Sequence, residues 1–334
     1  MSNAKRTSIV IIGCLAILSL LFVSLWSFAV YVPQNSQTTR STTVEIKPGS
    51  SITQIAQVLR QEDLVSSSFM FTLYARLSGK GDRLIPGTYE LKGSMNMPQI
   101  VDYIASGKVA ARKITVPEGF TVQKIAKLWS QAGFGVSQEF LSAAKQTYNY
   151  EFLPKAGPEV VYPVEGYLFP ATYQVSVNAS AQTFVKQMLD AFAQQAQPVL
   201  SGENSGKLTS AQVVTLASIV EREANDAVNR AKVSQVFINR LNQGMPLQSD
   251  VTVNYVTGKS NTAAADIVFK SPYNTYLVKS LPPGPICSPG LEAINAVLRP
   301  TKTDDLYFLA APNGEVYYAK TLTDHNKNID RYLK

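Results

Sequence analysis

Histidine and cysteine are nearly absent from this sequence of 334 residues, which contains one histidine and two cysteines. A zinc site built from cysteine and histidine ligands is therefore excluded, as is a Ser-His or Cys-His nucleophile unless His325 itself serves. Cys14 lies in an apolar run and Cys287 lies far along the chain, which argues against an intramolecular disulfide. We expect no metal and no cofactor, and carboxylates are the catalytic groups that remain.

Dense blocks of basic residues are also missing. The formal net charge is +7, from 31 lysines and arginines against 24 aspartates and glutamates, but the basic residues are scattered. Dense basic blocks usually mark contact with nucleic acid, so we expect no nucleic-acid partner. The mild positive excess is compatible with an anionic polymer or a membrane surface.

One long apolar run is present at residues 9–32, and it contains no charged residue. At a rise of 1.5 Å per residue, a helix of this length crosses the hydrocarbon core of a bilayer, which is about 30 Å thick. Lys5 and Arg6 precede the run, and Trp26 and Tyr31 lie near its far end, as interfacial aromatic residues do.

This run predicts a single-pass protein of the inner (plasma) membrane, with a cytoplasmic tail at 1–7 and a transmembrane signal anchor at 8–32. The N-terminus is expected in the cytoplasm and the bulk of the chain in the periplasm or extracytoplasmic space. A cleaved signal peptide is the competing interpretation, but the run is longer than a usual apolar core and lacks a clean cleavage site. A short polar linker, 33–42, follows the anchor.

A strand–turn–helix pattern occurs three times after the linker. In each copy a short strand is followed by a turn with glycine and then by apolar residues at helical spacing. The strands are Thr43–Ile46, Thr88–Leu91 and Ile114–Val116. Repeated βα packing with no ligand role explains the pattern as readily as a binding module does.

The first copy resembles a LysM-like module, the small βααβ fold that binds N-acetylglucosamine chains in many cell-wall proteins. The resembling residues are Val44-Glu-Ile46, Pro48-Gly49-Ser50 and Ile55-Ala56. This resemblance implies a LysM-like α/β domain at 43–112. The remainder, 113–334, is expected to be a mixed α+β domain, so the predicted fold class is α+β with one N-terminal transmembrane helix.

Several elements are predicted within 113–334. Helices are expected at 179–196, at 291–298 and from 322 onward, and an extended segment at 245–255. Loops are expected at 202–206, 271–276 and 281–286. A hairpin with a type I′ turn is expected around Asn313-Gly314. The aromatic stretch Tyr162–Tyr173 is expected to be a rigid loop that either lines a glycan groove or packs in the core.

One helical run of this domain carries a candidate catalytic carboxylate. Apolar residues recur at helical spacing from Val213 to Ala224, with Ser210 as the expected N-cap. Glu221 lies about 100° around the helix from the preceding apolar residue, beside this face. Burial against apolar neighbours disfavours the charged form, which makes Glu221 a candidate proton donor near neutral pH. A solvated Glu221 paired with Arg222 or Arg230 is the alternative.

Five short patterns occur along the chain. They are Glu165-Gly-Tyr-Leu-Phe-Pro170, Ala217-Ser-Ile-Val-Glu221-Arg-Glu223, Leu247-Gln-Ser-Asp250, Ser271-Pro-Tyr-Asn-Thr-Tyr276 and Leu281-Pro-Pro-Gly-Pro-Ile286. Together they resemble the YceG-like family, the membrane-anchored endolytic murein transglycosylases, over nearly all of the chain beyond the anchor. Two positions depart from the family: Ala171 stands where aspartate is common, and Val251 where proline is common.

The resemblance implies that Glu221 is the catalytic residue and that the substrate is a peptidoglycan glycan strand. The family cleaves the β-1,4 bond between N-acetylmuramic acid (MurNAc) and N-acetylglucosamine (GlcNAc) inside nascent strands. A 1,6-anhydro-MurNAc end results, which is expected to terminate strand elongation, and peptidoglycan synthases are expected partners. Because the muramyl C6 hydroxyl is the nucleophile, one positioned glutamate can act first as acid and then as base.

Supporting roles are expected for five polar residues of these patterns. They are Glu165, Gln248, Asp250, Asn274 and Tyr276. We expect them to line the groove and to hydrogen-bond the substrate's acetamido groups or the Glu221 carboxyl, with a purely structural role as the alternative for each. His325 is expected to cap or to pack, and Ala171 removes one possible supporting carboxylate.

Two other functions remain open. A non-catalytic, membrane-anchored peptidoglycan-binding protein would bind the same polymer and release no product. A hydrolytic muramidase would need a second carboxylate, for which Glu165 or Asp250 is available. An anhydro end is one water lighter than a reducing end, so the product mass separates the two cleavage chemistries.

Overall fold

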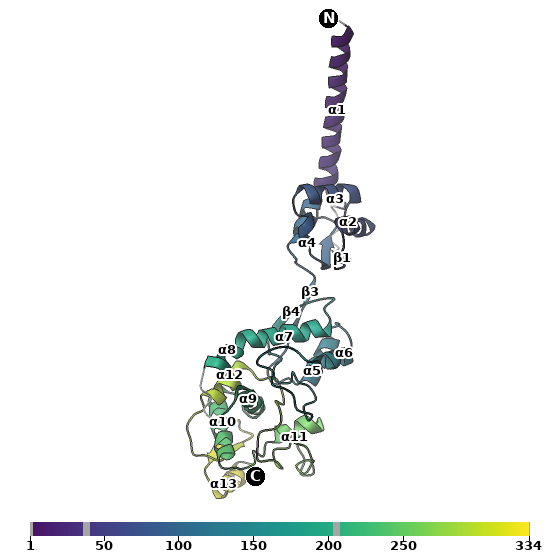
Figure 1. The fold of residues 1–334 in the computed structure, drawn as a ribbon. Helices are drawn as coiled ribbons and strands as arrows, with labels where there is room; N and C mark the ends of the chain where they lie inside the picture. The colour runs from purple at the N-terminus through teal and green to yellow at the C-terminus, as the bar shows by residue number, and fades with distance from the viewer. Residues whose placement is uncertain (1–2, 36–40, 203–207, 334) are drawn as a thin grey trace. The chain divides into compact units, whose positions relative to one another are not determined.

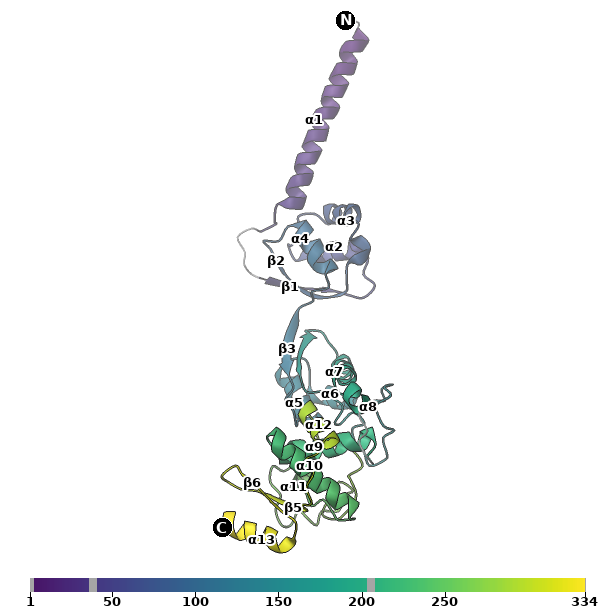
Figure 2. The ribbon, with the colours of Figure 1, turned by 90° about the vertical axis from the view of Figure 1, so that its left-hand side faces the viewer.

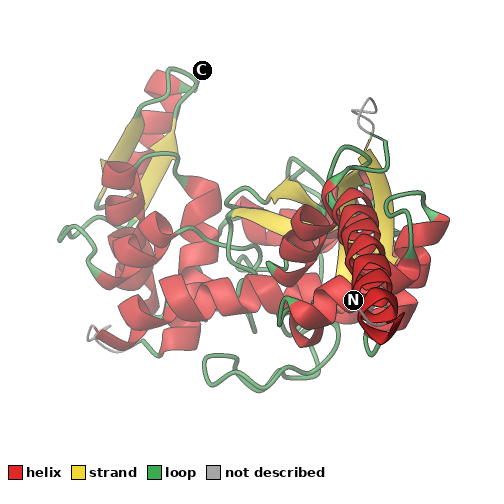
Figure 3. Cartoon of the chain, turned by 90° about the horizontal axis from the view of Figure 1, so that it is seen from above, coloured by secondary structure: helices red, strands yellow, loops and turns green. Residues whose placement is uncertain are grey.

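The computed structural model describes residues 3–35, 41–202 and 208–333 (Figure 1). Half of the predicted linker, residues 36–40, and most of the loop predicted at 202–206 lie outside the described residues. In the described part of the chain the strands form three two-stranded sheets, and helices are the predominant regular elements (Figure 3). The mixed α+β class predicted from the sequence is therefore confirmed.

The N-terminal apolar run forms a single helix. Helix α1 spans Asn3–Tyr31, and its stretch Ile12–Tyr31 has a mean hydropathy of 2.2 (Figure 1). Among the described residues, this is the one helix that is long and apolar enough to cross a membrane. In its last turns, Trp26 and Val30 pack against the apolar core of the first compact unit.

The chain divides into two compact units, of which the first comprises 1–112 and 174–178. Beyond α1 its elements are β1 (Ser41–Ile46), α2 (Ile52–Gln61), α3 (Ser68–Leu77), η1 (Gly81–Arg83), β2 (Gly87–Lys92) and α4 (Met97–Ala105) (Figure 2). The two strands pair antiparallel, from Ser41 opposite Lys92 to Ile46 opposite Gly87. Capping boxes at Ser51 and Asn96 start α2 and α4 after these strands.

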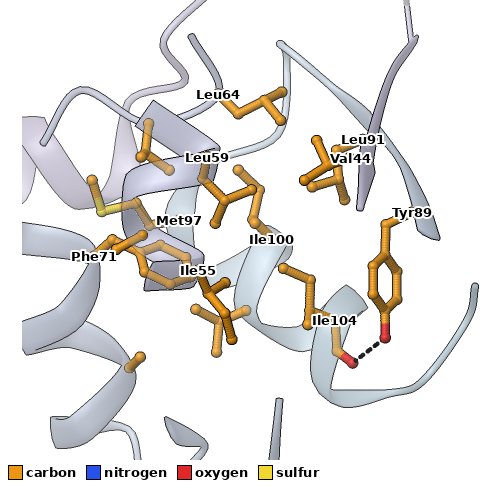
Figure 4. Close-up of a cluster of buried hydrophobic side chains, with 14 of the residues drawn as sticks. Val44, Ile55, Leu59, Leu64, Phe71, Tyr89, Leu91, Met97, Ile100 and Ile104 are labelled. Carbon is orange, nitrogen blue, oxygen red and sulfur yellow. Dashed lines mark hydrogen bonds between the residues drawn. The ribbon is translucent and has the colours of Figure 1, made fainter. Parts of the chain in front are cut away.

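Both strands and helices α2, α3 and α4 contribute to the apolar core of this unit (Figure 4). Tyr89 is fully buried there, and its hydroxyl donates to the carbonyls of Ile85 at 2.6 Å and Ile104 at 3.3 Å. These bonds satisfy the one polar group that the ring brings into the core. The core therefore holds the two strands against the helices.

The second unit comprises 113–173 and 179–334. Its helices are α5 (Val122–Gln131), α6 (Ser137–Ala144), α7 (Ala181–Gln195), α8 (Gln197–Gly202), α9 (Ser210–Glu223), α10 (Ala227–Asn242), α11 (Asp250–Thr257), α12 (Leu291–Leu298) and α13 (Leu322–Tyr332). Strands β3 (Ala111–Thr115) and β4 (Thr172–Ser176) form one sheet, and β5 (Tyr307–Ala310) and β6 (Val316–Ala319) form an antiparallel hairpin. The three predicted strand–turn–helix copies correspond to β1–α2, β2–α4 and β3–α5.

Helix α9 lies within the core of this unit, in contact with α10 and α12. Helices α5, α6 and α7 pack together around an aromatic cluster, in which the Trp129 ring lies 4.9 Å from Phe134 and 5.5 Å from Phe184. Of the loop predicted at Tyr162–Tyr173, residues 162–171 form a loop between α6 and α7, and the last two residues begin β4. This packing fixes the frame on which the candidate site is built.

Two local predictions in this unit are wrong. Residues 250–257 form a helix rather than an extended segment, because burial of Thr252 and Val253 overrides their β-branched preference and Gly258 ends the helix at a φ of 71°. The hairpin β5–β6 forms, but five residues separate its strands and Asn313 lacks the positive φ that Gly314 has. Its turn is therefore not type I′.

Candidate active site

Helix α9 carries Glu221 near its C-terminal end, and this helix is buried on all sides. Thr209, rather than the predicted Ser210, is the N-cap, and its hydroxyl accepts a hydrogen bond from the Gln212 N–H within a capping box. Every residue from Val213 to Glu221 is buried. The predicted apolar face is present, but α9 is a core helix and not an amphipathic one. Other helices also cover the faces that an amphipathic helix would leave exposed.

The Glu221 side chain is only 5% exposed, and both of its carboxylate oxygens accept hydrogen bonds. The Arg230 guanidinium donates from Nη2 to Oε1 at 2.7 Å, and the Gly290 N–H donates to Oε2 at 3.0 Å. Arg230 lies on α10, which packs against α9. The carboxyl is thus enclosed by protein rather than solvated at a helix end.

Arg230 joins Glu221 to two further carboxylates. Its Nη1 donates to Oε2 of Glu292 at 2.6 Å, and its Nη2 lies 4.0 Å from Oε2 of Glu118. Its Nε–H also donates to the Ala224 carbonyl at 3.2 Å. One guanidinium therefore faces three acidic side chains, so the ionised cluster carries excess negative charge, which favours the uptake of a proton.

Gly290 supplies space as well as a hydrogen bond. A Cβ atom at Gly290 would lie 1.9 Å from Oε1 of Glu118, so any side chain there would displace the Glu118 carboxylate. The preceding segment is tied to α9, because the Ile286 N–H donates to Oγ of Ser218 at 3.0 Å and the Cys287 thiol to the Ser218 carbonyl at 3.2 Å. This anchoring holds a backbone donor beside the candidate acid.

Burial raises the pKa of Glu221 above its ordinary value. Desolvation is the largest cause, and the charge of Glu118 acts in the same direction, whereas the Gly290 N–H and the Arg230 charge oppose it. A carboxylic acid with a raised pKa can donate a proton near neutral pH. The effect of burial predicted from the sequence is present, and Arg230 moderates it.

A cavity of about 530 Å³, within the usual size range of ligand pockets, lies next to this site: Arg222 lines it, whereas the neighbouring Glu221 does not. Gly119 lines this cavity, and a Cβ atom at Gly119 would lie 3.7 Å from Cγ of Glu221 and 3.4 Å from Cδ of Arg222. Tyr162 and Tyr273 also line it, which offers aromatic faces to a sugar ring. The Glu221 side chain therefore lies close behind the cavity wall at Gly119.

Glu165 forms part of the cavity wall and is nearly fully buried. Its carboxyl accepts hydrogen bonds from the Val122 N–H at 3.1 and 3.2 Å and from the Tyr255 hydroxyl at 3.3 Å. Burial nevertheless raises the pKa of Glu165 to about 8, against the effect of these bonds. Glu165 is therefore largely protonated at neutral pH and brings a neutral group to the wall.

The turn that follows Glu165 requires glycine. Gly166 has a φ of 85°, and a Cβ atom there would lie 2.3 Å from Cβ of Pro285. We expect Gly166→Ala to lower the free energy of unfolding by about 3 kcal/mol, because it adds backbone strain and a clash with a rigid ring. Thermal unfolding followed by circular dichroism measures this loss. Gly157→Ala is the control, since a Cβ atom there meets nothing within 4 Å; equal losses would contradict the explanation.

Gln248, Asp250 and Tyr276 form a second polar group. The Tyr276 hydroxyl donates to Oδ1 of Asp250 at 2.7 Å, and Nη1 of Arg240 donates to Oε1 of Gln248 at 3.2 Å. Gln248 has a φ of 52°, which is uncommon for a residue other than glycine and marks local strain. None of the three bonds Glu221, whose oxygens have other donors. Contact with the substrate remains a prediction for these residues.

Asn274 does not line a groove, which corrects the expectation for this residue. It is fully buried, its amide donates to the carbonyls of Ile267 and Phe269 at 2.8 Å, and its oxygen accepts from the Tyr276 N–H at 3.0 Å. Asn274 therefore holds the shape of the loop that carries Tyr276. His325 stacks on Tyr307 with ring centroids 5.3 Å apart, which is a packing contact.

Glu118, Gly290 and Glu292 complete the Glu221 site, and the sequence did not single them out. Glu118 lies in the Pro-Glu-Gly turn of the third strand–turn–helix copy. This sequence predicts a turn, but it gives no sign that Glu118 contacts the Glu221 site. Gly290 follows the proline-rich segment of the fifth pattern by four residues. Among the described residues no cluster of histidine, cysteine, aspartate and glutamate side chains suits a metal ion.

Comparison with known proteins places this arrangement in one class. The chain is 35% identical over 317 residues to the endolytic murein transglycosylase of Bacillus subtilis strain 168, which covers 90% of this chain and 87% of that protein. It is 32% identical over 332 residues to the endolytic murein transglycosylase of Streptococcus pneumoniae serotype 2, again over 90% of this chain but 60% of that protein. The chain thus resembles transglycosylases over nearly its full length.

A solved structure agrees with this class. The crystal structure of a yceG-like protein of Listeria monocytogenes matches with a TM-score of 0.57 and 34% identity, covering 87% of this chain and 99% of that one. A profile described as the YceG-like family matches residues 44–331. The chain belongs to the YceG-like family.

Proposed function

We propose that this protein is an endolytic murein transglycosylase in which Glu221 is the catalytic acid and base. The observation that carries the proposal is an enclosed carboxyl with a raised pKa beside a cavity of about 530 Å³. The names of the relatives in B. subtilis and S. pneumoniae support the reaction class. The proposed substrate is the glycan strand of nascent peptidoglycan.

The proposed reaction cleaves the β-1,4 bond between MurNAc and GlcNAc. Protonated Glu221 gives its proton to the bridging oxygen as the bond from this oxygen to muramyl C1 breaks. The resulting carboxylate then takes the proton of the muramyl C6 hydroxyl as the C6 oxygen bonds to C1. The products are a 1,6-anhydro-MurNAc end and a free GlcNAc hydroxyl, and no water is consumed.

The surroundings of Glu221 suit both halves of this reaction. Burial and the nearby Glu118 carboxylate favour the protonated acid that starts the cycle. Arg230 and the Gly290 N–H stabilise the carboxylate that exists between the two proton transfers. Burial and Glu118 therefore favour the acid, whereas Arg230 and the Gly290 N–H favour the carboxylate. Exposed Gln248 and Asp250 and half-buried Tyr276 are proposed to contact the acetamido groups of the strand.

The proposed organisation has three parts. Helix α1 anchors the chain in the plasma membrane by a single pass with the N-terminus in the cytoplasm, as its apolar stretch supports. Residues 43–112 form a LysM-like domain that binds GlcNAc chains, which the β1–α2–α3–β2 order supports. Residues 113–334 form the catalytic domain outside the cytoplasm. Peptidoglycan synthases are the proposed partners, and cleavage terminates strand growth.

The mass of the products tests the proposal. The full chain in detergent is incubated with uncrosslinked peptidoglycan strands, and the released glycans are analysed by mass spectrometry. A transglycosylase yields ends that are one water lighter than reducing ends. Binding of the strands without any shortened product would instead identify a non-catalytic binding protein.

A hydrolytic muramidase is the second candidate, because the structure places a second carboxylate near Glu221. The Glu118 and Glu221 oxygens lie 4.0 and 2.7 Å from the same nitrogen of Arg230, so the two carboxyls face a common space. Hydrolases of glycosidic bonds use such pairs, with one group acting on water. Products with reducing ends in the same mass spectra would favour this candidate over the transglycosylase.

A further inference from the structure

The cavity beside Glu221 carries cations that lack acidic partners. Lys124, Lys127, Arg222 and Lys259 line it, and only Lys259 forms an ion pair, with Asp266 at 2.6 Å. In the described part of the chain no carboxylate lies within ion-pair distance of the other three cations. Lys124 instead lies over the Phe120 ring, 5.7 Å from its centroid. Unpaired cations around a concave site favour an anionic ligand.

Two of these cations, Lys124 and Arg222, also lie close enough to repel each other. Partial burial lowers the pKa of Lys124, and the charge of Arg222 lowers it further. The acidic residues in the wall offset little of this charge at neutral pH, because Glu165 is largely protonated and Glu159 alone remains. The cavity therefore has a positive potential that an incoming anion would relieve.

The position of these cations ties them to the reacting bond. Arg222, which lines the cavity, follows Glu221 in α9, and a Cβ atom at Gly119 in the cavity wall would lie 3.7 Å from Cγ of Glu221. A glycan bound at Glu221 would therefore have a cavity with three unpaired cations beside it. The GlcNAc–MurNAc backbone is uncharged, so the anion must be carried by a substituent of the sugar.

We propose that Lys124, Lys127 and Arg222 bind the carboxylates of the stem peptide attached to the muramyl sugar, an inference that rests on the proposed function. The lactyl group on O3 of each MurNAc continues into a peptide with free carboxylates. The other anion of a nascent strand, the pyrophosphate that joins it to its lipid carrier, occurs once and at one end. An endolytic cut inside the strand always has a stem peptide beside it and usually has no pyrophosphate there.

The volume of the cavity is consistent with this ligand. About 530 Å³ accommodates a few residues of a peptide, whereas a single carboxylate would leave most of the space empty. The site would therefore select strands that still carry their peptides. It would place the muramyl sugar in a fixed register relative to Glu221, since the peptide leaves the sugar at one defined oxygen.

Synthetic uncrosslinked strands in two forms test the proposal. Both have the same glycan and the same peptide, but in one form the stem carboxylates are carboxamides. The full chain is expected to show a KM about tenfold higher for the carboxamide strands, with little change in kcat, because charge-assisted hydrogen bonds are lost. In the variant Lys124→Met/Lys127→Met the ratio of the two KM values should fall to about one.

Lys186→Met is the matched control, since Lys186 is an exposed lysine of the same unit that does not line the cavity, and it should keep the tenfold ratio. A second pair of strands, with and without the lipid pyrophosphate, separates the two possible anions. A preference for the strands that carry the pyrophosphate overturns the proposal. An equal rise in KM for the acidic and the carboxamide strands in the Lys124→Met/Lys127→Met variant overturns it as well.

The proposed function and this inference fail in different ways. Binding of both strand types to the Glu221→Gln chain is measured alongside cleavage. If the wild-type chain releases no product, the proposed function fails, while the tenfold preference in binding still supports the cavity as a carboxylate site. Equal binding of the acidic and the carboxamide strands overturns the cavity assignment whatever the cleavage assay shows.

Discussion

Glu221→Gln is expected to abolish the release of anhydro-ended glycan from uncrosslinked peptidoglycan strands while the chain stays folded. The amide cannot supply a proton to the bridging oxygen or remove one from the C6 hydroxyl, so we expect the rate to fall by about 10²- to 10⁴-fold or more. The amide oxygen can still accept a hydrogen bond from Arg230 or Gly290, which keeps the polar contacts of the site partly satisfied. Mass spectrometry of released glycans measures the effect.

Glu223→Gln is the control for this variant. Glu223 lies two residues further along the same helix, but its carboxylate accepts from the Ser249 hydroxyl at 2.5 Å and belongs to a different contact. The Glu223→Gln substitution makes the same chemical change in the same helix and leaves the cluster around Arg230 unchanged. Release by Glu221→Gln at the wild-type rate would remove Glu221 from the mechanism, and loss in both variants would point to damage of the helix.

Most helices and the candidate acid were predictable because their signals are local. Helix α12 spans Leu291–Leu298, as the spacing of its apolar residues predicts, and α7 lies within its predicted range. Glu221 was singled out because it follows an apolar run at helical spacing, and burial in fact raises its pKa. Such inferences need only neighbours within two turns of a helix.

Arg230 was a candidate partner of Glu221 in the sequence, but its pairing in a buried site and the contact with Gly290 were not predictable, because the fold alone brings these residues together. Arg230 is nine residues away and Gly290 is 69 residues away. Helical spacing indicates which face an element buries but not which element covers it, and so α9 was expected to be half exposed although it is fully enclosed. Helix α11 shows the opposite failure, since β-branched residues at 251–253 favoured a strand and tertiary burial prevailed.

Arg230→Met is expected to lower the free energy of unfolding by about 3–5 kcal/mol at neutral pH, the largest stability effect of any substitution at this site. Methionine fills much of the space of the arginine stem but leaves the buried Glu221 carboxylate with no cation. Glu118 and Glu292 also lose the charge that lies between them and Glu221. Chemical denaturation followed by circular dichroism measures the loss.

The loss should depend on pH in a defined direction. Without Arg230 the pKa of Glu221 in the folded state rises further above its value in the unfolded chain, so the folded state binds more protons than the unfolded state between those two pKa values. The variant is therefore closest to the wild type at acid pH, and its deficit grows as the pH rises from the raised folded pKa of the wild type toward the still higher folded pKa of the variant. A deficit of equal size at acid and neutral pH would mean that lost packing, rather than the unpaired charge, is the cause.

The double variant Arg230→Met/Glu221→Gln separates these causes at a single pH. If the deficit comes from an unpaired buried charge, removing that charge restores much of the stability, and the two substitutions are strongly non-additive. If the deficit comes from packing or from the lost bond to the Ala224 carbonyl, the second substitution leaves it in place. Recovery would show that Arg230 stabilises the carboxylate form of Glu221, the form that takes the C6 hydroxyl proton in the second half of the proposed cycle.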